Sequence, residues 1–335
     1  MKRLVILAPN WLGDAVMALP AIADVRRQSP GVSITVAARP TIAPLFQLVP
    51  EVNDTIVLPR AGAIADVAAW RLLGAELAGQ QFDTALLFPN SLHSALVVFR
   101  AGIPERWGYR AGWRGGLLTR AVRRKRGLHQ VEYYQRLVSG LGFPNGPVAP
   151  RVTVPGEARD RAARLLADAG WDGRAPLMAL APGAAYGGAK RWPPAYFAEL
   201  ADSLAADGVR CVMIGGAADA ATGIEILGAL GRRDQMIDLI GRTDLPTLAA
   251  VFCCARGLVT NDSGAMHLAA AAGVGVTAVF GPTDDAATRP MGDAHVVLVH
   301  PVWCRPCMLR ECPIDHRCMR GIRVAAVLDA ARRTL

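Results

Sequence analysis

The stretch Leu258-Val-Thr-Asn-Asp-Ser-Gly-Ala-Met-His-Leu-Ala-Ala-Ala-Ala-Gly273 contains the unit on which the fold is built. It begins as a short apolar strand, breaks at a polar turn and continues as an alanine-rich helix. Asp262 and Ser263 are good N-cap residues, and Gly264 lets the backbone approach a ligand closely. Because free N–H groups and the helix dipole favour an anion there, the turn suits a phosphate, with His267 within reach. A capped strand–loop–helix with a surface histidine is the alternative.

The same alternation of short apolar strands and helices runs through the rest of the chain. The predicted strands are residues 3–8, 32–38, 55–58, 84–88, 177–181, 209–214, 236–239, 257–260 and 276–280. The predicted helices are residues 14–27, 64–77, 91–100, 131–141, 159–169, 194–206, 224–230, 246–253, 265–272 and 324–333. Strands alternating with helices imply parallel sheets covered by helices on both faces, so the predicted class is α/β.

One linker divides this pattern into two halves. Gly142–Pro155 holds four prolines and two glycines in fourteen residues. With 335 residues, two domains are expected, 1–150 and 151–335. Two similar α/β domains predict a ligand in the cleft that separates them.

Composition narrows the function classes. The chain is 52% hydrophobic and 19% charged, which is ample for a packed core. The first apolar run stops at Pro9, which favours a buried strand over a signal peptide. The longest apolar stretch, Leu268–Phe280, is shorter than the ~20 residues of a membrane span. Seven cysteines do not pair evenly, which suits a reducing compartment. We therefore expect a soluble, cytoplasmic protein.

Positive charge is concentrated in one segment. The net charge of +9 favours anionic partners: nucleic acid, acidic lipid or a phosphorylated substrate. Arg100–Arg126 contains nine arginines or lysines against one acid, Glu105. A solvated basic face is the simpler interpretation, but so one-sided a cluster favours a binding surface. Trp107, Tyr109 and Trp113 lie within it and are candidates for an interface.

Two loops after predicted strands carry candidate chemistry. In Ala8-Pro-Asn-Trp-Leu-Gly-Asp-Ala15, Asp14 is either a helix cap or a general base for a substrate hydroxyl. The loop Ala181–Pro193 combines three glycines with Lys190 and Arg191, a composition that suits a diphosphate. It lacks the Gly-Lys-Ser/Thr of a Walker loop, and a plain glycine-rich surface loop is the alternative.

Two more loops complete the set. The next predicted strand ends in the loop Phe280-Gly-Pro-Thr-Asp-Asp285. This loop and the Asn261–Gly264 turn could together contact one nucleotide. Ile214-Gly-Gly-Ala-Ala-Asp219 places an acid, Asp219, where it could hold sugar hydroxyls. All four loops follow strands, and open α/β sheets bind ligands at that edge.

Together these loops resemble the ADP-heptose–lipopolysaccharide heptosyltransferase family, most closely its heptosyltransferase II branch. The motifs that carry the resemblance span nearly the whole chain and occur in the same order as in the family. It implies a GT-B fold of two Rossmann-like domains with a deep inter-domain cleft, the first binding the acceptor and the second the donor. It also implies that the terminal helix packs back on the first domain. The motifs are Asn10-Trp-Leu-Gly-Asp14, Pro182-Gly-Ala184, Ala189-Lys-Arg-Trp-Pro193, Thr260-Asn-Asp-Ser-Gly264, Met266-His267 and Gly281-Pro-Thr283.

The family's site residues carry over position by position. Asp14 matches the catalytic base, and Lys190 matches the lysine that binds the donor phosphate. The donor-binding turn corresponds to Asp262, Ser263, Gly264 and His267, and Asp219 is a further donor-side candidate. Some members have threonines where Ala185 and Tyr186 stand here, so backbone N–H groups would have to replace those hydroxyl contacts.

The resemblance implies inverting, metal-independent transfer of heptose from ADP-heptose to the inner core of lipopolysaccharide. Asp14 would deprotonate the acceptor hydroxyl, and Lys190 would stabilise the leaving diphosphate. No Asp-x-Asp triplet occurs that could hold a divalent ion. The implied acceptor is a Kdo–lipid A inner core at an anionic inner-leaflet surface, which gives the enzyme a peripheral place at the inner membrane. Its predicted contacts are Arg120, Arg123, Arg124 and Arg126.

Four cysteines near the end of the chain, with His300 and His316 nearby, resemble a binding site for a soft metal ion. Their spacings differ from the paired Cys-x-x-Cys of zinc ribbons, so reduced thiols are the default, and a structural metal, an iron–sulfur centre or disulfides are alternatives. Similar tails occur in only some family members, so no cofactor is required for the chemistry. The four are Cys304, Cys307, Cys312 and Cys318.

Three other functions remain open. Heptosyltransferase I, or another nucleotide-heptose transferase, is the nearest rival. A sugar-nucleotide epimerase of the same shape would act without an acceptor. A non-catalytic nucleic-acid-binding protein fits the pI of about 9.6, but no helix-turn-helix, finger or RNA-binding signature is present, so no nucleic-acid partner is expected.

Overall fold

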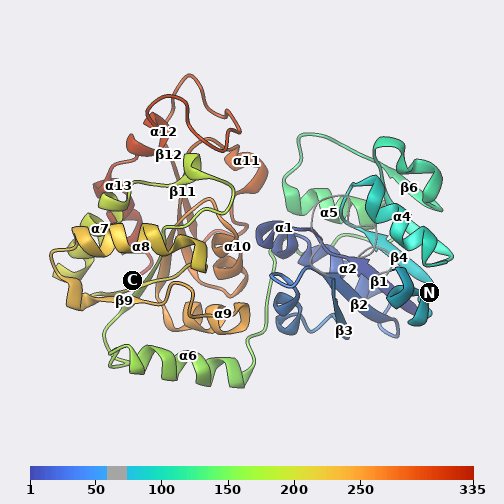
Figure 1. Ribbon diagram of the computed structural model, residues 1–335, viewed down its shortest axis with the longest axis horizontal. Helices are drawn as coiled ribbons and strands as arrows, with labels where there is room; N and C mark the ends of the chain where they lie inside the picture. Colours follow the sequence, from blue (N-terminus) through green and yellow to red (C-terminus); the bar gives the residue numbers. More distant parts are fainter. Residues whose placement is uncertain (59–73) are drawn as a thin grey trace. The chain divides into compact units, whose positions relative to one another are not determined.

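The computed structural model describes residues 1–58 and 74–335. By its internal contacts the chain divides into two compact units, Met1–Pro150 and Arg151–Leu335 (Figure 1). Each unit contains a six-stranded sheet, and every described strand pair is parallel. Parallel strands need crossover connections, and helices supply most of them here.

The sheet of the first unit has the order β3-β2-β1-β4-β5-β6. Its central strand β1 pairs with β2 on one side and with β4 on the other, so Leu4 lies between Ile34 and Thr84. The strands are β1 Arg3–Leu7, β2 Ser33–Ala38, β3 Asp54–Val57, β4 Thr84–Leu87, β5 Glu105–Arg110 and β6 Arg120–Arg123. The helices are α1 Leu12–Met17, α2 Leu19–Gln28, α4 Leu92–Arg100 and α5 Gln130–Ser139, with short 3-10 helices η1 Ala43–Leu48 and η2 Gly112–Leu117.

The sheet of the second unit has the order β12-β11-β10-β7-β8-β9. Its strands are β7 Leu177–Ala181, β8 Arg210–Met213, β9 Met236–Asp238, β10 Gly257–Asn261, β11 Gly275–Phe280 and β12 His295–Val299. The helices are α6 Gly156–Asp168, α7 Pro194–Ala206, α8 Ala220–Ala229, α9 Leu245–Cys254, α10 Gly264–Ala271, α11 Asp285–Thr288, α12 Arg317–Arg320 and α13 Val324–Arg332. Short 3-10 helices are η3 Gly188–Lys190, η4 Ala217–Asp219 and η5 Arg233–Gln235.

Counted along the chain, both sheets have the Rossmann order 3-2-1-4-5-6. The strand order reverses between β1 and β4 in the first unit and between β7 and β10 in the second. Open α/β sheets bind ligands at such a switch point, outside the carboxyl ends of the strands. The predicted class, two Rossmann-like α/β sheets, is confirmed.

The contact of the last helix with the first domain stays a prediction. The buried face of this helix, with Val324, Val327 and Ala331, belongs to the core of the second unit, where α13 packs against α7, β10 and β11. The reason is its apolar stripe, which completes the layer over this sheet. Among the helices that the structure describes, none is long and apolar enough to cross a bilayer.

The basic segment differs most from its prediction. It forms two strands, β5 and β6, which the sequence analysis missed because arginines and glycines interrupt the apolar pattern. Strand β12 was also missed, although its His-Val-Val-Leu-Val run is a plain strand signal. The predicted helix 14–27 is broken at Ala18, because Pro20 begins a second helix there. Most of the predicted helix 64–77 lies outside the described residues.

A buried arginine organises the basic segment. Arg114 has no exposed surface, and its guanidinium donates to five oxygens. They are Tyr109 O at 3.0 Å, Asn90 Oδ1 at 3.3 Å, Ser94 Oγ at 3.3 Å, Ser91 O at 3.5 Å, and Pro89 O. Burial lowers the pKa of Arg114 to about 10. These bonds tie the turn η2 to the end of β5 and to the residues that follow β4.

Replacing Arg114 with methionine should therefore destabilise the first unit. The change leaves several carbonyl and hydroxyl oxygens without donors, and we expect a loss of about 3 kcal/mol in the free energy of unfolding. Urea unfolding followed by circular dichroism measures it. The matched control is Lys125→Met, which removes an exposed cation from the same segment and should cost less than about 0.5 kcal/mol. Equal losses for the two variants would contradict the structural role of Arg114.

Candidate active site

Three loops meet at the carboxyl edge of the second sheet. Strand β10 lies between β7 and β11, so the loops that follow these strands are neighbours. They are residues 182–193 after β7, residues 262–263 after β10, and residues 281–284 after β11. Each of the three was selected from the sequence as a candidate loop, and the parallel sheet brings them together.

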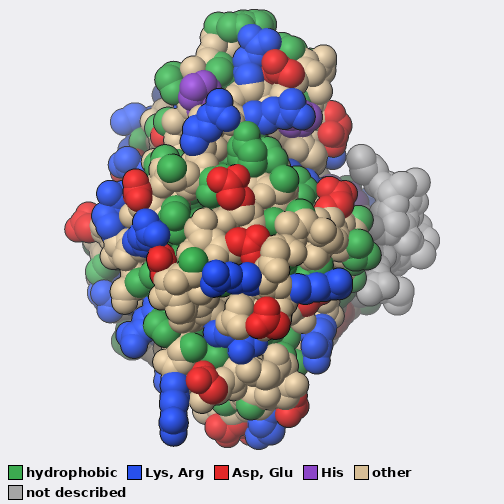
Figure 2. All heavy atoms as spheres, turned by 90° about the vertical axis from the view of Figure 1, so that its left-hand side faces the viewer, with side chains coloured by type: hydrophobic (Ala, Val, Ile, Leu, Met, Phe, Trp, Pro, Cys, Tyr) green, Lys and Arg blue, Asp and Glu red, His purple; other side chains and the backbone are tan. Residues whose placement is uncertain are grey.

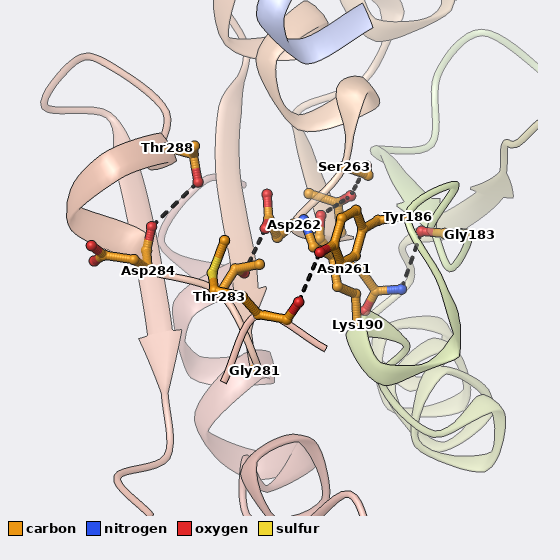
Figure 3. Close-up of polar contacts among 12 residues, drawn as sticks. Gly183, Tyr186, Lys190, Asn261, Asp262, Ser263, Gly281, Thr283, Asp284 and Thr288 are labelled. Carbon is orange, nitrogen blue, oxygen red and sulfur yellow. Dashed lines mark hydrogen bonds and ion pairs between the residues drawn. The ribbon is translucent and has the colours of Figure 1, made fainter. Parts of the chain in front are cut away.

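Asn261 joins two of these loops. Its side chain is fully buried. Its Oδ1 accepts from the backbone N–H of Trp192 at 3.0 Å, and its Nδ2 donates to Pro182 O at 2.7 Å. The same Nδ2 donates to Gly183 O at 3.3 Å (Figure 3). One amide therefore satisfies buried backbone groups at both ends of the residue 182–193 loop. From the sequence, Asn261 is predicted only as a turn residue, although its place at the end of a buried strand is a signal for this role.

Lys190 and Asp262 form an ion pair in this loop cluster. Lys190 Nζ lies 2.6 Å from Asp262 Oδ2, and the two side chains are only 13% and 7% exposed. The Thr283 hydroxyl donates to the same carboxylate oxygen at 2.6 Å (Figure 3). Charge-assisted bonds of this length hold their partners firmly, so the ammonium group is fixed beside the start of α10.

The start of α10 differs in detail from its prediction. Ser263 occupies the N-cap position, but its side chain makes no capping bond, and its Oγ lies 3.2 Å from Thr260 Oγ1. Asp262, whose carboxylate is taken by Lys190 and Thr283, does not cap the helix either. The first N–H groups of α10 are thus not used by the two predicted caps, which suits an anionic ligand. His267 is buried on α10, at 5% exposed, and is not a surface residue.

Tyr186 connects the lysine loop to the cysteine-rich segment, residues 304–318. Lys190 Nζ lies 4.8 Å from the centre of the Tyr186 ring, and the Arg310 guanidinium lies 5.4 Å from it. The Tyr186 hydroxyl donates to Met308 O at 2.8 Å. Gly187 has φ +154°, and a Cβ there would lie 2.3 Å from Arg310 O. The cysteine-rich segment therefore packs directly on the loop that carries Lys190.

The same segment also supports the residue 281–284 loop. Arg305 Nε donates to Gly281 O at 2.9 Å, and Arg305 Nη2 donates to Thr283 O at 3.2 Å and to Asp285 Oδ1 at 2.5 Å. Two of the three candidate loops are thus held by one tail segment. This contact could not be found from the sequence, since residues far apart in the chain make it.

No disulfide joins the cysteines. None of the seven, each of which lies within the described residues, forms a disulfide. Within residues 1–58 and 74–335, no three His, Cys, Asp or Glu side chains are arranged to hold a metal ion. Burial raises the pKa of the Cys318 thiol, which favours its protonated form.

Asp219 lies beside the lysine loop as well. Its carboxylate accepts from Gly216 N at 3.0 Å and is 4.0 Å from Arg191 Nη2. A Cβ on Gly183 would lie 2.4 Å from this carboxylate, so only glycine allows such a close approach. The structure brings Asp219 together with the candidate donor loop.

Asp14 belongs to the first unit, in the helix α1 that follows the switch-point strand β1. It lies inside the first turn of α1 and not at the N-cap, which is Trp11. A carboxylate in the first turn is stabilised by the helix dipole. The hydroxyl of Tyr134 donates to Asp14 Oδ1 at 3.5 Å, and burial raises the pKa of Tyr134 well above its usual value. Tyr134 therefore stays a donor toward Asp14 through the physiological pH range.

The predicted acceptor arginines have different environments. Arg120 lies over the Trp107 ring at 5.0 Å and donates to Leu141 O at 2.8 Å, while Arg124 lies 5.9 Å from the centre of the Tyr133 ring. All four predicted arginines, Arg123 and Arg126 included, are exposed.

The aromatic residues of the basic segment are not all at its surface. The expectation of an interface is wrong for Trp107 and Tyr109, which are 7% and 0% exposed. Their β5 side chains pack inward, against Phe143 and Tyr133. Trp113, on the turn η2, is 95% exposed. On the face of the second unit seen in Figure 2, basic and acidic side chains are interspersed, so the surplus positive charge is not gathered on that face.

The chain matches one protein family and several solved structures. A family model described as glycosyltransferase family 9 (heptosyltransferase) matches residues 70–317. Lipopolysaccharide heptosyltransferase 2 of Salmonella typhimurium is 33% identical over 86% of this chain and 85% of its own length. The structure of E. coli ADP-heptose LPS heptosyltransferase II has a TM-score of 0.84 at 31% identity, covering 100% of this chain and 98% of that chain. E. coli heptosyltransferase WaaC with ADP has a TM-score of 0.76 at 19% identity, covering 100% of both chains.

Removal of the Asn261 amide should loosen the loop cluster. In Asn261→Ala, two carbonyls and the Trp192 N–H lose their partner, and we expect the free energy of unfolding to fall by about 2 to 4 kcal/mol. The neighbouring change Ser263→Ala removes a hydroxyl that makes no capping bond and should cost less than about 1 kcal/mol. Urea unfolding of both variants measures the difference. Similar costs would show that Asn261 does not organise the loops.

Proposed function

The chain belongs to glycosyltransferase family 9, the heptosyltransferases, and from this premise we propose that it transfers heptose from ADP-heptose to the inner core of lipopolysaccharide. The GT-B-like fold and the loop motifs agree with the family matches over most of the chain. The observation that carries the site assignment is the buried Lys190–Asp262 ion pair beside the start of α10.

The donor belongs to the second unit in this proposal. Lys190 supplies a fixed positive charge, and the first N–H groups of α10 supply oriented dipoles, a combination that suits a diphosphate. Asp262 and Thr283 hold the ammonium group in place, so little reorganisation is needed when the ligand binds. The solved relative WaaC contains ADP, which is the product that this donor would leave. Asp219 and the backbone of the residue 182–193 loop complete the donor contacts.

The acceptor is activated from the first unit. Asp14 removes the proton from the acceptor hydroxyl, and the resulting oxygen attacks the anomeric carbon from the face opposite the diphosphate. The bond to the diphosphate breaks as the new glycosidic bond forms, so the anomeric configuration inverts. Tyr134 orients the Asp14 carboxylate through its hydroxyl.

The departing ADP carries developing negative charge, which Lys190 and the α10 dipole stabilise. The chain lacks the Asp-x-Asp triplet that would present paired carboxylates to a divalent ion, which supports a metal-independent mechanism. The cysteine-rich segment then has a supporting role in this proposal, because it packs on two donor loops.

The acceptor is an anionic glycolipid, the Kdo–lipid A inner core. The basic segment supplies the charge for such a partner, and about 1 kcal/mol per basic residue near an anionic surface supports reversible docking. We therefore place the enzyme at the cytoplasmic face of the inner membrane, bound peripherally. All four predicted arginines are exposed and available for this contact, and the side chains of Arg120 and Arg124 also contact aromatic rings of the protein.

Loss of the Asp14 carboxylate tests the catalytic assignment. Asp14→Asn should lower kcat by about 10² to 10⁴-fold, since a positioned general base contributes that much. ADP release from ADP-heptose with a Kdo–lipid A acceptor measures turnover. The matched control is Asp54→Asn, which removes an exposed carboxylate of the same unit. The base assignment fails if Asp14→Asn turns over as fast as this control.

Loss of the Lys190 charge tests the donor assignment. Lys190→Met should raise the Kd for ADP by about tenfold or more, since a hydrogen-bonded charge contact contributes about 1.5 to 3 kcal/mol. Isothermal titration calorimetry measures this affinity directly. Asp14→Asn serves as the control here and should bind ADP with the affinity of the wild type. Unchanged ADP affinity in Lys190→Met would contradict the donor site.

A further inference from the structure

An open hollow lies at the carboxyl ends of β5 and β6 in the first unit. Its volume is about 550 Å³, within the range of small-molecule sites. Most of its lining comes from the glycine-rich turn η2, and two arginines and one tryptophan supply its large side chains. The lining residues are Arg110, Gly112, Trp113, Gly115, Gly116, Ala121 and Arg123.

The two arginines are adjacent and carry uncompensated charge. Arg110 and Arg123 are register partners at the ends of the parallel strands β5 and β6, and both are exposed. No acidic side chain in the described parts of the chain forms an ion pair with either of them. Like charges placed side by side on neighbouring strands repel each other. An anion bound by both guanidinium groups would remove this repulsion.

The turn η2 holds the Trp113 side chain in solvent. This side chain is 95% exposed, although its neighbour Arg114 is fully buried and donates to oxygens at the end of β5 and on the residues that follow β4. Gly112, with φ +51°, allows the chain to turn immediately before Trp113. A fixed turn that exposes a large apolar ring suits a ligand with an apolar face.

We propose that this hollow binds a phosphorylated sugar of the acceptor glycolipid. The phosphate lies between the guanidinium groups of Arg110 and Arg123, which match its oxygens with paired N–H donors. The C–H face of the sugar ring lies against the Trp113 indole. The glycines leave room for the ring, because they have no side chains. This inference rests on the proposed function, in which the first unit receives the acceptor.

The place of the hollow in the sheet fits an acceptor. All six strands of the first sheet are parallel, so the hollow and Asp14, which follows β1, lie at the same carboxyl edge. Strands β5 and β6 are two and three positions from β1 in the sheet. At about 4.8 Å per strand this corresponds to roughly 10 to 15 Å along the edge. The phosphorylated sugar would therefore lie a short way along the oligosaccharide from the hydroxyl that reacts.

A kinetic experiment with two acceptors tests this site. The variants are Arg110→Gln/Arg123→Gln and Trp113→Ala, all at exposed positions where folding should be unaffected. The acceptor is used with its phosphates intact and after enzymatic dephosphorylation. With the intact acceptor, both variants should raise the acceptor KM by about tenfold or more, while kcat and the KM for ADP-heptose stay near those of the wild type. With the dephosphorylated acceptor, the arginine variant should match the wild type, and Trp113→Ala should still be impaired.

The matched control is Lys2→Gln. It removes one exposed cation from the same unit at the amino edge of the sheet, just before β1, and should leave both KM values unchanged. An equal rise in KM for Lys2→Gln would show that net charge, and not the hollow, attracts the acceptor. That result would overturn the inference.

A second arm separates a sugar phosphate from a lipid headgroup. Co-sedimentation with phosphatidylglycerol vesicles should fall equally in the arginine variant and in Lys125→Gln/Arg126→Gln, which also removes two exposed cations of the basic segment. The KM for a delipidated, phosphorylated core oligosaccharide should rise only in the arginine variant. Loss of vesicle binding without a change in this KM would overturn the proposal in favour of a membrane contact. If the wild type fails to release ADP with any acceptor, the proposed function itself fails. If the wild type turns over and the variants share its KM, only the hollow assignment fails.

Discussion

The candidate donor site depends on two adjacent side chains at the end of one buried strand. Asn261 uses its amide to tie down both ends of the loop that follows β7, and Asp262 uses its carboxylate to hold Lys190 from that loop. Strand β10 is next to β7 because the strand order reverses there. The switch point thus brings the loops after β7 and β10 together, and the side chains of Asn261 and Asp262 fix the ammonium group of Lys190 there.

Much of the fold follows from local patterns in the sequence. Apolar runs marked the buried strands such as β7 and β10, because strands covered on both faces must be apolar. The same rule explains the failures at β5 and β6, where arginines alternate with small or aromatic residues near the sheet edge. The buried Arg114 could not be recognised either, since only the folded chain shows the five oxygens that accept hydrogen bonds from its guanidinium.

The sequence allowed the residues of the candidate site to be selected, but not the contacts that these residues make with one another. Lys190 and Asp262 were selected for their residue types and loop positions, yet 72 residues separate them, and no spacing rule pairs them. The expected capping role of Asp262 was wrong because an ion pair with Lys190 competes for the carboxylate. The support that Arg305 and Arg310 give to the donor loops also arises from tertiary packing alone.

The central claim is that this chain moves a heptose between two molecules. The most direct measurement combines ADP release with mass spectrometry of a Kdo–lipid A acceptor after incubation with ADP-heptose. We expect one heptose to be added to the acceptor for each ADP released, and the new bond to have the anomeric configuration opposite to that of the donor. Consumption of ADP-heptose with no change in the mass of the acceptor, or a retained configuration, would contradict it.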